Sequence, residues 1–124
     1  MASKSTHPID RLFATIASRK GADPATSYTA QLLKDGAARC AKKFGEEAVE
    51  AALAAAAKDK KALTAESADV LYHLLVVWTA CGITPSDVYA ALKAREGRSG
   101  LAEKASRKKR TSPTSSRRRL PPSA

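Results

Sequence analysis

The residues of this chain best suited to chemistry are two pairs of acidic side chains. Glu47 and Glu50 are three positions apart in one segment, and Glu66 and Asp69 have the same spacing in the next. Side chains three positions apart share one face of an α-helix. If the two segments are antiparallel helices, their facing sides can bring four carboxylates together, as helical bundles do in metal sites.

These candidate ligands are all carboxylates, with no clustered histidine or cysteine. Such a donor set favours Mg²⁺, or alternatively Mn²⁺, over Zn²⁺. Mg²⁺ held by a few carboxylates usually completes its coordination with water and substrate phosphate. The pattern therefore points to phosphoryl-group chemistry.

The segment around the first pair, "KKFGEEAVEAALAAAAK", is so rich in alanine that we expect it to be packed on nearly every side. Glu50 precedes "AALAAAA", and Asp69 precedes the apolar run "VLYHLLVV". A buried carboxylate without a matching cation costs several kcal/mol. We therefore expect both carboxylates to be buried beside a cation.

An ordinary surface role is the competing interpretation for the first acids of this segment. Lys42 and Lys43 precede Glu46 and Glu47 by four positions, a spacing typical of exposed helical ion pairs worth a few tenths of a kcal/mol. Acid pairs on solvated helix faces are also common without a metal. For Glu46 taken alone, we favour the surface pair.

Two neighbours of the acids have alternatives of their own. Gly45 lies inside a helical pattern, where it costs about 1 kcal/mol relative to alanine, so we expect a close approach of backbone or substrate there. His73 lies four positions after Asp69, near the same face. We favour a core or supporting histidine that hydrogen-bonds a neighbour over a catalytic one, because placement alone does not establish proton transfer.

The elements that must position these residues are helices. An amphipathic pattern runs through Ile9–Ile16, with Thr6 as a possible cap, and no convincing alternating strand pattern occurs. Ser27 offers a cap for the next helix, and Thr84 with Asp87 predicts a capping box for the last. The further helices are expected at 28–35, 37–58, 65–80 and 85–96, with "DKKALT" breaking the chain before 65. Five helices with short connections predict an all-α bundle.

Charge separates this bundle from a tail. The chain carries 22 Lys and Arg against 12 Asp and Glu, a net charge of +10. Residues 107–124 hold seven of the basic residues and no acid, and are rich in Pro and Ser. We therefore predict a folded domain at residues 1–106 and a disordered basic tail at 107–124. Nucleic-acid binding is expected only weakly and through this tail.

Cysteine usage and hydropathy predict a cytoplasmic protein. Cys40 and Cys81 lie in apolar helical patterns without a CxxC spacing, and we expect both to be buried, reduced thiols. No secretory leader is recognised, and the longest apolar run, Val70–Cys81, is too short to span a bilayer. We expect no membrane association.

Four blocks of the chain together resemble one family. They are "SYTAQLL" (27–33), "KKFGEEAVE" (42–50), "ESADVLYHLLV" (66–76) and "REGRSGLAEKASR" (95–107). The ExxE and ExxD pattern is typical of the wider all-α, MazG-like nucleotide pyrophosphohydrolases. The first and last blocks are more specific, because they resemble phosphoribosyl-ATP pyrophosphohydrolase of histidine biosynthesis. The resemblance covers about residues 9–107.

This resemblance implies Mg²⁺-dependent hydrolysis of phosphoribosyl-ATP to phosphoribosyl-AMP and pyrophosphate, the second step of L-histidine biosynthesis. The implied metal ligands are Glu47, Glu50, Glu66 and Asp69. Glu46 and Glu47 are the implied catalytic acids, with Glu46 an accessory carboxylate that orients or activates water. The chain lacks the metal-binding cysteines of the cyclohydrolase fused to this activity in some organisms, so a stand-alone enzyme is expected.

Substrate binding and assembly are also implied by the resemblance. The implied substrate-binding residues are Lys43, Arg95, Arg98, Ser99 and Lys104. The C-terminal block that holds the last four could instead dock on a partner subunit. Relatives of this kind are homodimers at least, so a homodimer or higher homo-oligomer is expected. For Ser27 and Tyr28 we favour capping and packing of the second helix over shaping the nucleotide pocket.

Two other functions compete with this assignment. One is a MazG-like house-cleaning hydrolase of non-canonical nucleoside triphosphates, which a turnover comparison with phosphoribosyl-ATP would distinguish. The other is a nucleic-acid-binding module acting through "RKKR" and "RRR" of the tail. It predicts lost function when residues 108–124 are removed, whereas the enzyme hypothesis predicts retained turnover.

Overall fold

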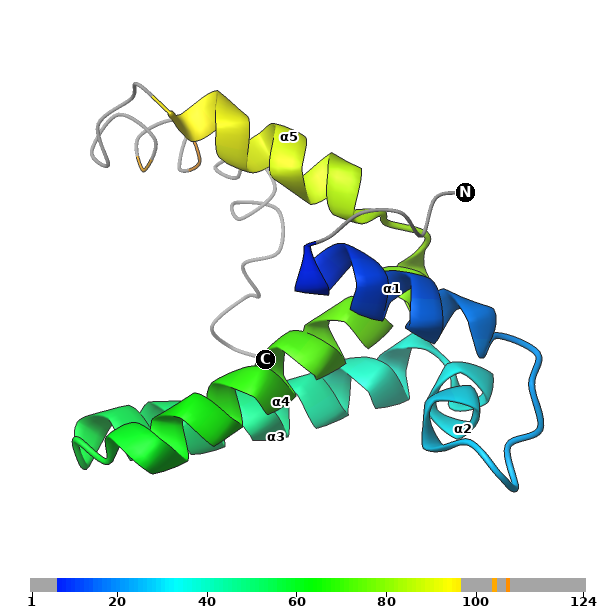
Figure 1. Cartoon of the computed structure of the whole chain (residues 1–124), viewed down its shortest axis with the longest axis horizontal. Coiled ribbons are helices and arrows are strands. Elements are labelled where there is room, and N and C mark those ends of the chain that lie inside the picture. Colours follow the sequence, from blue (N-terminus) through cyan, green and yellow to red (C-terminus); the bar gives the residue numbers. More distant parts are fainter. Residues whose placement is uncertain (1–6, 97–103, 105–106, 108–124) are drawn as a thin grey trace, which may run out of the picture. The chain divides into compact units, whose positions relative to one another are not determined.

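A computed structural model describes residues 7–96, 104 and 107 of the chain. Its five helices are α1 (Pro8–Ser18), α2 (Tyr28–Asp35), α3 (Ala37–Ala56), α4 (Lys60–Cys81) and α5 (Pro85–Arg95) (Figure 1). No strand occurs among the described residues, so the all-α prediction is confirmed. The predicted disorder of 107–124 concerns residues that lie, apart from Arg107, outside the described part.

The chain falls into two compact units, Met1–Asp87 and Val88–Ala124. In the first unit, α3 and α4 lie side by side as a helical hairpin joined by a short turn (Figure 1). Helix α1 packs on α4, while α2 contacts both α3 and α4. The hairpin is therefore the scaffold on which the predicted acids are displayed. The domain boundary predicted at residue 106 stays a prediction.

The core of the first unit is small. Its fully buried side chains come from α1, α2, α3 and α4: Ile16, Leu32, Cys40, Leu75 and Val76. In the alanine-rich part of α3 only Ala54 is buried, while Val49 and Leu53 are 59% and 64% exposed. The expectation that this segment is packed on nearly every side is therefore wrong for a single chain. Alanine favours the helical conformation there, although most of these alanine side chains are not covered by another part of the chain.

Capping residues set most helix starts. The Ser27 Oγ accepts a hydrogen bond from the Ala30 N–H at 3.1 Å, as predicted. The capping box before α5 is also confirmed, with the Thr84 N–H donating to Asp87 Oδ2 at 2.9 Å and the Asp87 N–H donating to Thr84 Oγ1 at 3.3 Å. These two predictions hold because a cap depends on only a few neighbouring residues.

Two other helix starts differ from the prediction. The cap of α1 is His7, whose Nδ1 accepts from the Ile9 N–H at 3.1 Å, whereas Thr6 lies outside the described residues. Helix α4 begins at Lys60 rather than at 65, because the Asp59 side chain accepts from the Ala62 N–H at 3.0 Å and starts the helix earlier. The segment "DKKALT" is therefore a helix start, and its interpretation as a break is wrong.

The two cysteines differ in burial. Cys40 is fully buried and donates its thiol to the Leu32 carbonyl at 3.2 Å, and burial raises the pKa of this thiol. Cys81 is exposed, so the expectation that both thiols are buried is wrong for this residue.

Among the described helices, none alone has the length and apolarity to cross a membrane, although α4 and α5 pass that test as a bent pair.

Candidate metal and substrate site

The helical hairpin brings three of the four predicted ligands together. Glu47 of α3 and Glu66 and Asp69 of α4 each offer one carboxylate oxygen, and these oxygens lie within 4.8 Å of one another. We call these three residues the carboxylate cluster. Glu47 and Glu66 are half-buried, and Asp69 is exposed. Their convergence from two helices confirms the juxtaposition that the acid spacing predicted.

Glu50 lies at the edge of this arrangement. It is not one of the three residues whose oxygens converge, but its charge contributes to raising the pKa of Glu66, so it is electrostatically coupled to the cluster. Glu50 and Asp69 are both exposed, so the expectation that they are buried is wrong. The carboxylate whose environment needs an explanation is instead Glu66.

Glu66 has an unfavourable environment for a charged group. Its Oε1 is out of contact with solvent and has no hydrogen-bond partner among the described residues. Burial raises the pKa of this carboxyl, and the charges of three neighbouring acids raise it further; these are Glu50, Asp69 and Glu47. No salt bridge reaches the carboxylate cluster from any described residue. A bound cation would relieve both the burial and the repulsion.

The dimensions of the carboxylate cluster fit a small divalent cation. Ligand oxygens at Mg²⁺ distances, about 2.1 Å, are about 2.9 Å apart when adjacent and about 4.2 Å apart when opposite. The observed limit of 4.8 Å is slightly longer than the opposite spacing and clearly longer than the adjacent one, so the oxygens have to move closer together to share one cation. Since two of the three side chains are on one helix and no described residue forms a salt bridge with any of them, small rotamer changes would close the set. The donor chemistry and the orphaned Glu66 oxygen both fit Mg²⁺ or Mn²⁺.

Beside the cluster, Lys43 and Glu46 form an ion pair with an Nζ–Oε1 distance of 3.0 Å. This confirms the surface-pair interpretation of Glu46, at a spacing of three rather than four residues. Glu46 raises the pKa of Lys43, and Lys43 in turn lowers the pKa of Glu46. Lys43 is half-buried and one turn of α3 before Glu47. An ammonium is therefore available beside the carboxylates, currently shared with Glu46.

His73, one turn of α4 after Asp69, is buried, with 7% of its surface exposed. Burial lowers the pKa of the imidazole, and the charge of Glu47 opposes this shift. Its ring makes edge contacts with Tyr72 and Tyr28, at centroid distances of 4.9 and 6.3 Å. The core role is confirmed, but the predicted hydrogen bond is not found at Nδ1, which has no partner in the described part of the chain.

Gly45 does not provide a close approach within the chain. A Cβ added at this position would meet no heavy atom within 4 Å. The expectation of a close contact with the chain's own backbone is therefore wrong. A contact with substrate or with a second chain would have to justify the glycine instead.

Comparison with known proteins identifies the family of this chain. A family model described as phosphoribosyl-ATP pyrophosphohydrolase matches residues 9–96. A phosphoribosyl-ATP pyrophosphatase of Azospirillum brasilense is 55% identical over 100 residues, covering 81% of this chain and 90% of its own. Those of Roseobacter denitrificans and Paracoccus denitrificans are 59% identical over 99 and 104 residues, covering 80% and 82% of this chain and 94% and 96% of theirs.

The chain belongs to the phosphoribosyl-ATP pyrophosphohydrolase family. The family model spans α1 to α5 and includes the whole carboxylate cluster. The resemblance inferred from the four sequence blocks is thereby confirmed. The individual metal, catalytic and substrate roles of the residues stay predictions.

The C-terminal residues that the family resemblance implied for substrate binding lie in the second unit. Arg95 is the last residue of α5, and Arg95 and Lys104 are both exposed. Arg98 and Ser99 lie outside the described residues. Substrate binding by this block and its docking on a partner subunit both stay predictions.

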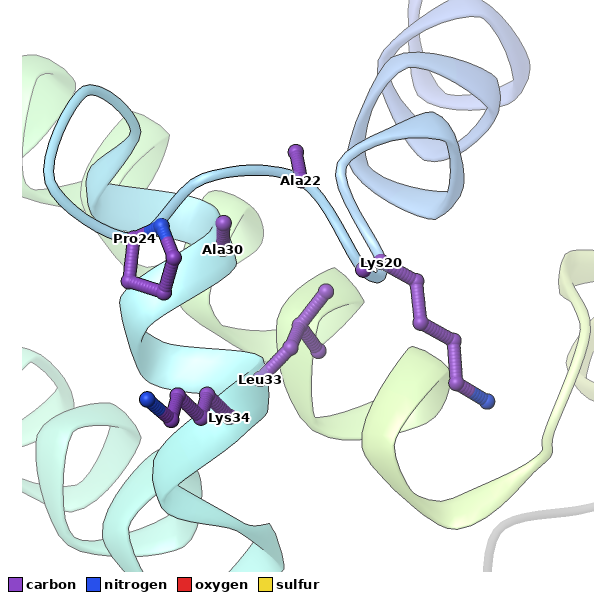
Figure 2. Close-up of a pocket in the computed structure, with 7 residues that line it drawn as sticks. Lys20, Ala22, Pro24, Ala30, Leu33 and Lys34 are labelled. Atoms are coloured by element: carbon purple, nitrogen blue, oxygen red, sulfur yellow. The ribbon is translucent and has the colours of Figure 1, made fainter.

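A cavity of about 390 Å³ is lined by none of the residues of the carboxylate cluster. Its lining comes from the connection between α1 and α2 and from α2 itself: Lys20, Gly21, Ala22, Pro24, Ala30, Leu33 and Lys34. Figure 2 shows the amino groups of Lys20 and Lys34 pointing away from each other on opposite sides of Leu33. The two cations therefore do not converge on one anion, and none of the predicted site residues lines this cavity.

Proposed function

We propose that this chain hydrolyses phosphoribosyl-ATP to phosphoribosyl-AMP and pyrophosphate, the second step of L-histidine biosynthesis, with Mg²⁺ held by the carboxylate cluster. One observation carries the proposal. Three carboxylates that form no salt bridge with a described residue converge on the hairpin of a chain that is 55–59% identical to proteins named phosphoribosyl-ATP pyrophosphatase. A cytoplasmic location is part of the same proposal.

In this proposal the acids divide into two groups. Glu47, Glu66 and Asp69 hold the cation, and Glu50 joins them from the next turn of α3. A divalent cation in such a place neutralises phosphate charge and acidifies a water molecule. Glu66 supplies an oxygen that has no hydrogen-bond partner among residues 7–96 and therefore gains most from a cation. The burial of this oxygen also keeps competing water away from it.

The second group contains Glu46, which forms an ion pair with Lys43. When the Lys43 ammonium turns to a substrate phosphate, the Glu46 carboxylate loses its 3.0 Å partner. A carboxylate released in this way accepts a proton from the attacking water more readily than one that stays paired. Glu46, assisted by Glu47, is therefore the proposed base. The water oxygen forms a bond to one phosphorus of the α–β phosphoanhydride, and the bond from that phosphorus to the bridging oxygen breaks. Phosphoribosyl-AMP and pyrophosphate separate, and the proton of the water goes to the Glu46 carboxylate.

We further propose that the active form is a homodimer. Few apolar side chains of the described residues are buried, whereas Val49, Leu53 and Leu71 of the hairpin are 59%, 64% and 42% exposed. Val49 and Leu53 are four positions apart and so share one face of α3. A second chain that covers this face would supply the packing that the alanine-rich segment lacks.

The test is pyrophosphate release from phosphoribosyl-ATP with and without Mg²⁺, in the wild type and in Glu66→Gln and Asp69→Asn. We expect turnover to fall at least about 100-fold in each variant and to vanish with a chelator, because losing a residue that only supports a metal ligand already costs about 10–100-fold. Asp35→Asn is the control, because it removes one charge from an exposed position at the end of α2. Undiminished turnover in the two site variants would refute the site. A preference for ordinary or damaged nucleoside triphosphates would refute the substrate.

A further inference from the structure

The side chain of Tyr28 stands out among the aromatic residues of the first unit. The other aromatic rings of this unit are at least partly covered, whereas Tyr28 is 52% exposed; the covered ones are Phe13, Phe44, Tyr72 and Trp78. Tyr28 is the first residue of α2, and the Ser27 cap fixes the backbone at this point. A large apolar ring is thus presented to solvent from a rigid position. The packing role favoured for Tyr28 accounts only for the part of its ring that contacts His73.

The rings behind Tyr28 hold it in place. Tyr28 meets the His73 ring edge-on, at an interplanar angle of 85°. His73 in turn meets Tyr72 at 78°, and the Tyr72 hydroxyl is hydrogen-bonded to Thr29 of α2. The edge-to-face contacts and this hydrogen bond tie α2 to α4. Of the three rings, that of Tyr28 has the most surface available for another molecule.

This series of rings lies next to the carboxylate cluster. His73 is one turn of α4 after Asp69, and it experiences the charges of Glu47 and Lys43. Tyr28 also contributes to the raised pKa of Lys43, although Glu46 is the main cause. The exposed ring is therefore adjacent to the groups proposed to bind the phosphates. A nucleotide whose phosphates are bound there has to place its base against the surrounding surface, and Tyr28 is the most exposed aromatic ring of this unit.

We propose that Tyr28 is a substrate-binding residue whose exposed ring stacks on a purine base of the nucleotide, while His73 and Tyr72 hold that ring in position. Every base has a π-face that can stack on an aromatic side chain, so this contact adds affinity without reading hydrogen bonds. The assignment rests on the proposed function, because it takes the nucleotide to be the ligand of the carboxylate cluster.

Two substitutions separate the aromatic ring from its bulk. Tyr28→Phe keeps the ring, and Tyr28→Leu keeps an apolar side chain of moderate size without a π-face. We expect Tyr28→Leu to raise the KM for phosphoribosyl-ATP about 10-fold or more with little change in kcat, and Tyr28→Phe to stay within about twofold of the wild type. Equal KM values in the wild type and Tyr28→Leu would overturn the proposal.

A binding measurement tests the contact independently of turnover. ATP and inorganic tripolyphosphate, each with Mg²⁺, are titrated into the wild type and the two variants. We expect Tyr28→Leu to weaken ATP binding about 10-fold and to leave tripolyphosphate binding unchanged, because only ATP carries a base. Equal losses for both ligands, or a changed oligomeric state in Tyr28→Leu, would overturn the proposal and assign the ring to packing.

The same titration distinguishes this proposal from the proposed function. If the wild type fails to hydrolyse phosphoribosyl-ATP but ATP binding still depends on the ring, the stacking stands and the reaction is wrong. If the wild type hydrolyses phosphoribosyl-ATP and neither KM nor ATP binding depends on the ring, the reaction stands and the stacking is wrong.

Discussion

The two ends of the α3–α4 hairpin differ in how they are packed. At the end where α1 and α2 cover the hairpin, Cys40, Leu75 and Val76 are at most 1% exposed. At the other end, near the turn between the helices, Leu53 is 64% exposed and the alanines around it are mostly uncovered. The carboxylate cluster lies between these two ends. The site is therefore anchored by the core on one side and open on the other.

This difference indicates what each end contributes. The covered end fixes the direction of both helices, and with it the distance between Glu47 and the acids of α4. The open end carries side chains that gain stability only when another surface covers them. Substitutions at the two ends should consequently affect different properties, namely folding at the covered end and association at the open end.

The largest effect is expected for Leu75→Ala at the covered end. It removes a side chain that is 1% exposed, and such truncations cost about 2–5 kcal/mol of unfolding free energy. The matched change at the open end, Leu53→Ala, should cost less than about 0.5 kcal/mol when the protein is dilute enough to be monomeric. Urea denaturation measures both. Equal losses would contradict the distinction between the two ends.

The next effect concerns association. Leu53→Asp should shift the protein from dimer to monomer, weakening association about 30-fold or more, as expected when a buried anchor worth about 2 kcal/mol is lost. The helical circular dichroism signal should remain. Ala14→Asp, at an exposed position of α1, is the control and should leave the dimer intact. Sedimentation that shows the same species in all three proteins would refute a role of this face in association.

A smaller effect is expected for Gly45→Ala, between the two ends. Alanine is favoured over glycine by about 1 kcal/mol in a helix, and the added Cβ meets nothing within 4 Å. The free energy of unfolding of the isolated chain should therefore rise by about this amount. A loss of stability would show that a neighbour approaches this face. Reduced turnover in a Gly45→Ala variant that has gained stability would instead indicate that substrate approaches this position.

The smallest effect on stability is expected from the titration of Glu66 in the metal-free protein. Burial and neighbouring charges raise the pKa of this carboxyl above its ordinary value of 4.5. The folded state therefore binds this proton more tightly, and the metal-free protein loses stability as the pH rises from below 4.5 through the raised pKa. Glu66→Gln removes this loss, so its Tm should exceed that of the wild type increasingly toward neutral pH.

Thermal unfolding in a chelator, from about pH 4 to about pH 7, measures this difference. Adding Mg²⁺ should reverse it, because only the wild type gains stability from the cation. A Tm difference that does not change with pH, or a wild type more stable than the variant without metal, would contradict the environment assigned to Glu66.

The sequence predicted the acids and their helices well because those signals are local. The spacing of Glu47, Glu66 and Asp69 depends only on helix periodicity and on a hairpin. The caps at Ser27 and Thr84 depend on residues no more than three positions away. The start of α4 was missed because Asp59 was treated as part of a break rather than as a cap.

Burial was harder to predict because it depends on what covers each face. Alanine-rich sequence is compatible with close packing and with an exposed helix, and this explains the errors at Glu50 and around Leu53. Cys81 follows an apolar pattern but lies at the end of α4, where the pattern no longer faces the core. The exposure of Tyr28 was missed for a similar reason, since an eight-residue helix gives little periodicity from which to infer its buried face.

The central claim is that the carboxylate cluster binds a divalent cation. The most direct test is a calorimetric titration of Mg²⁺, and of Mn²⁺, into the metal-free wild type, the double variant Glu66→Gln with Asp69→Asn, and the control Asp35→Asn. We predict binding to the wild type and to the control and none to the folded double variant. Equal binding to all three proteins, or none to any of them, would contradict the account.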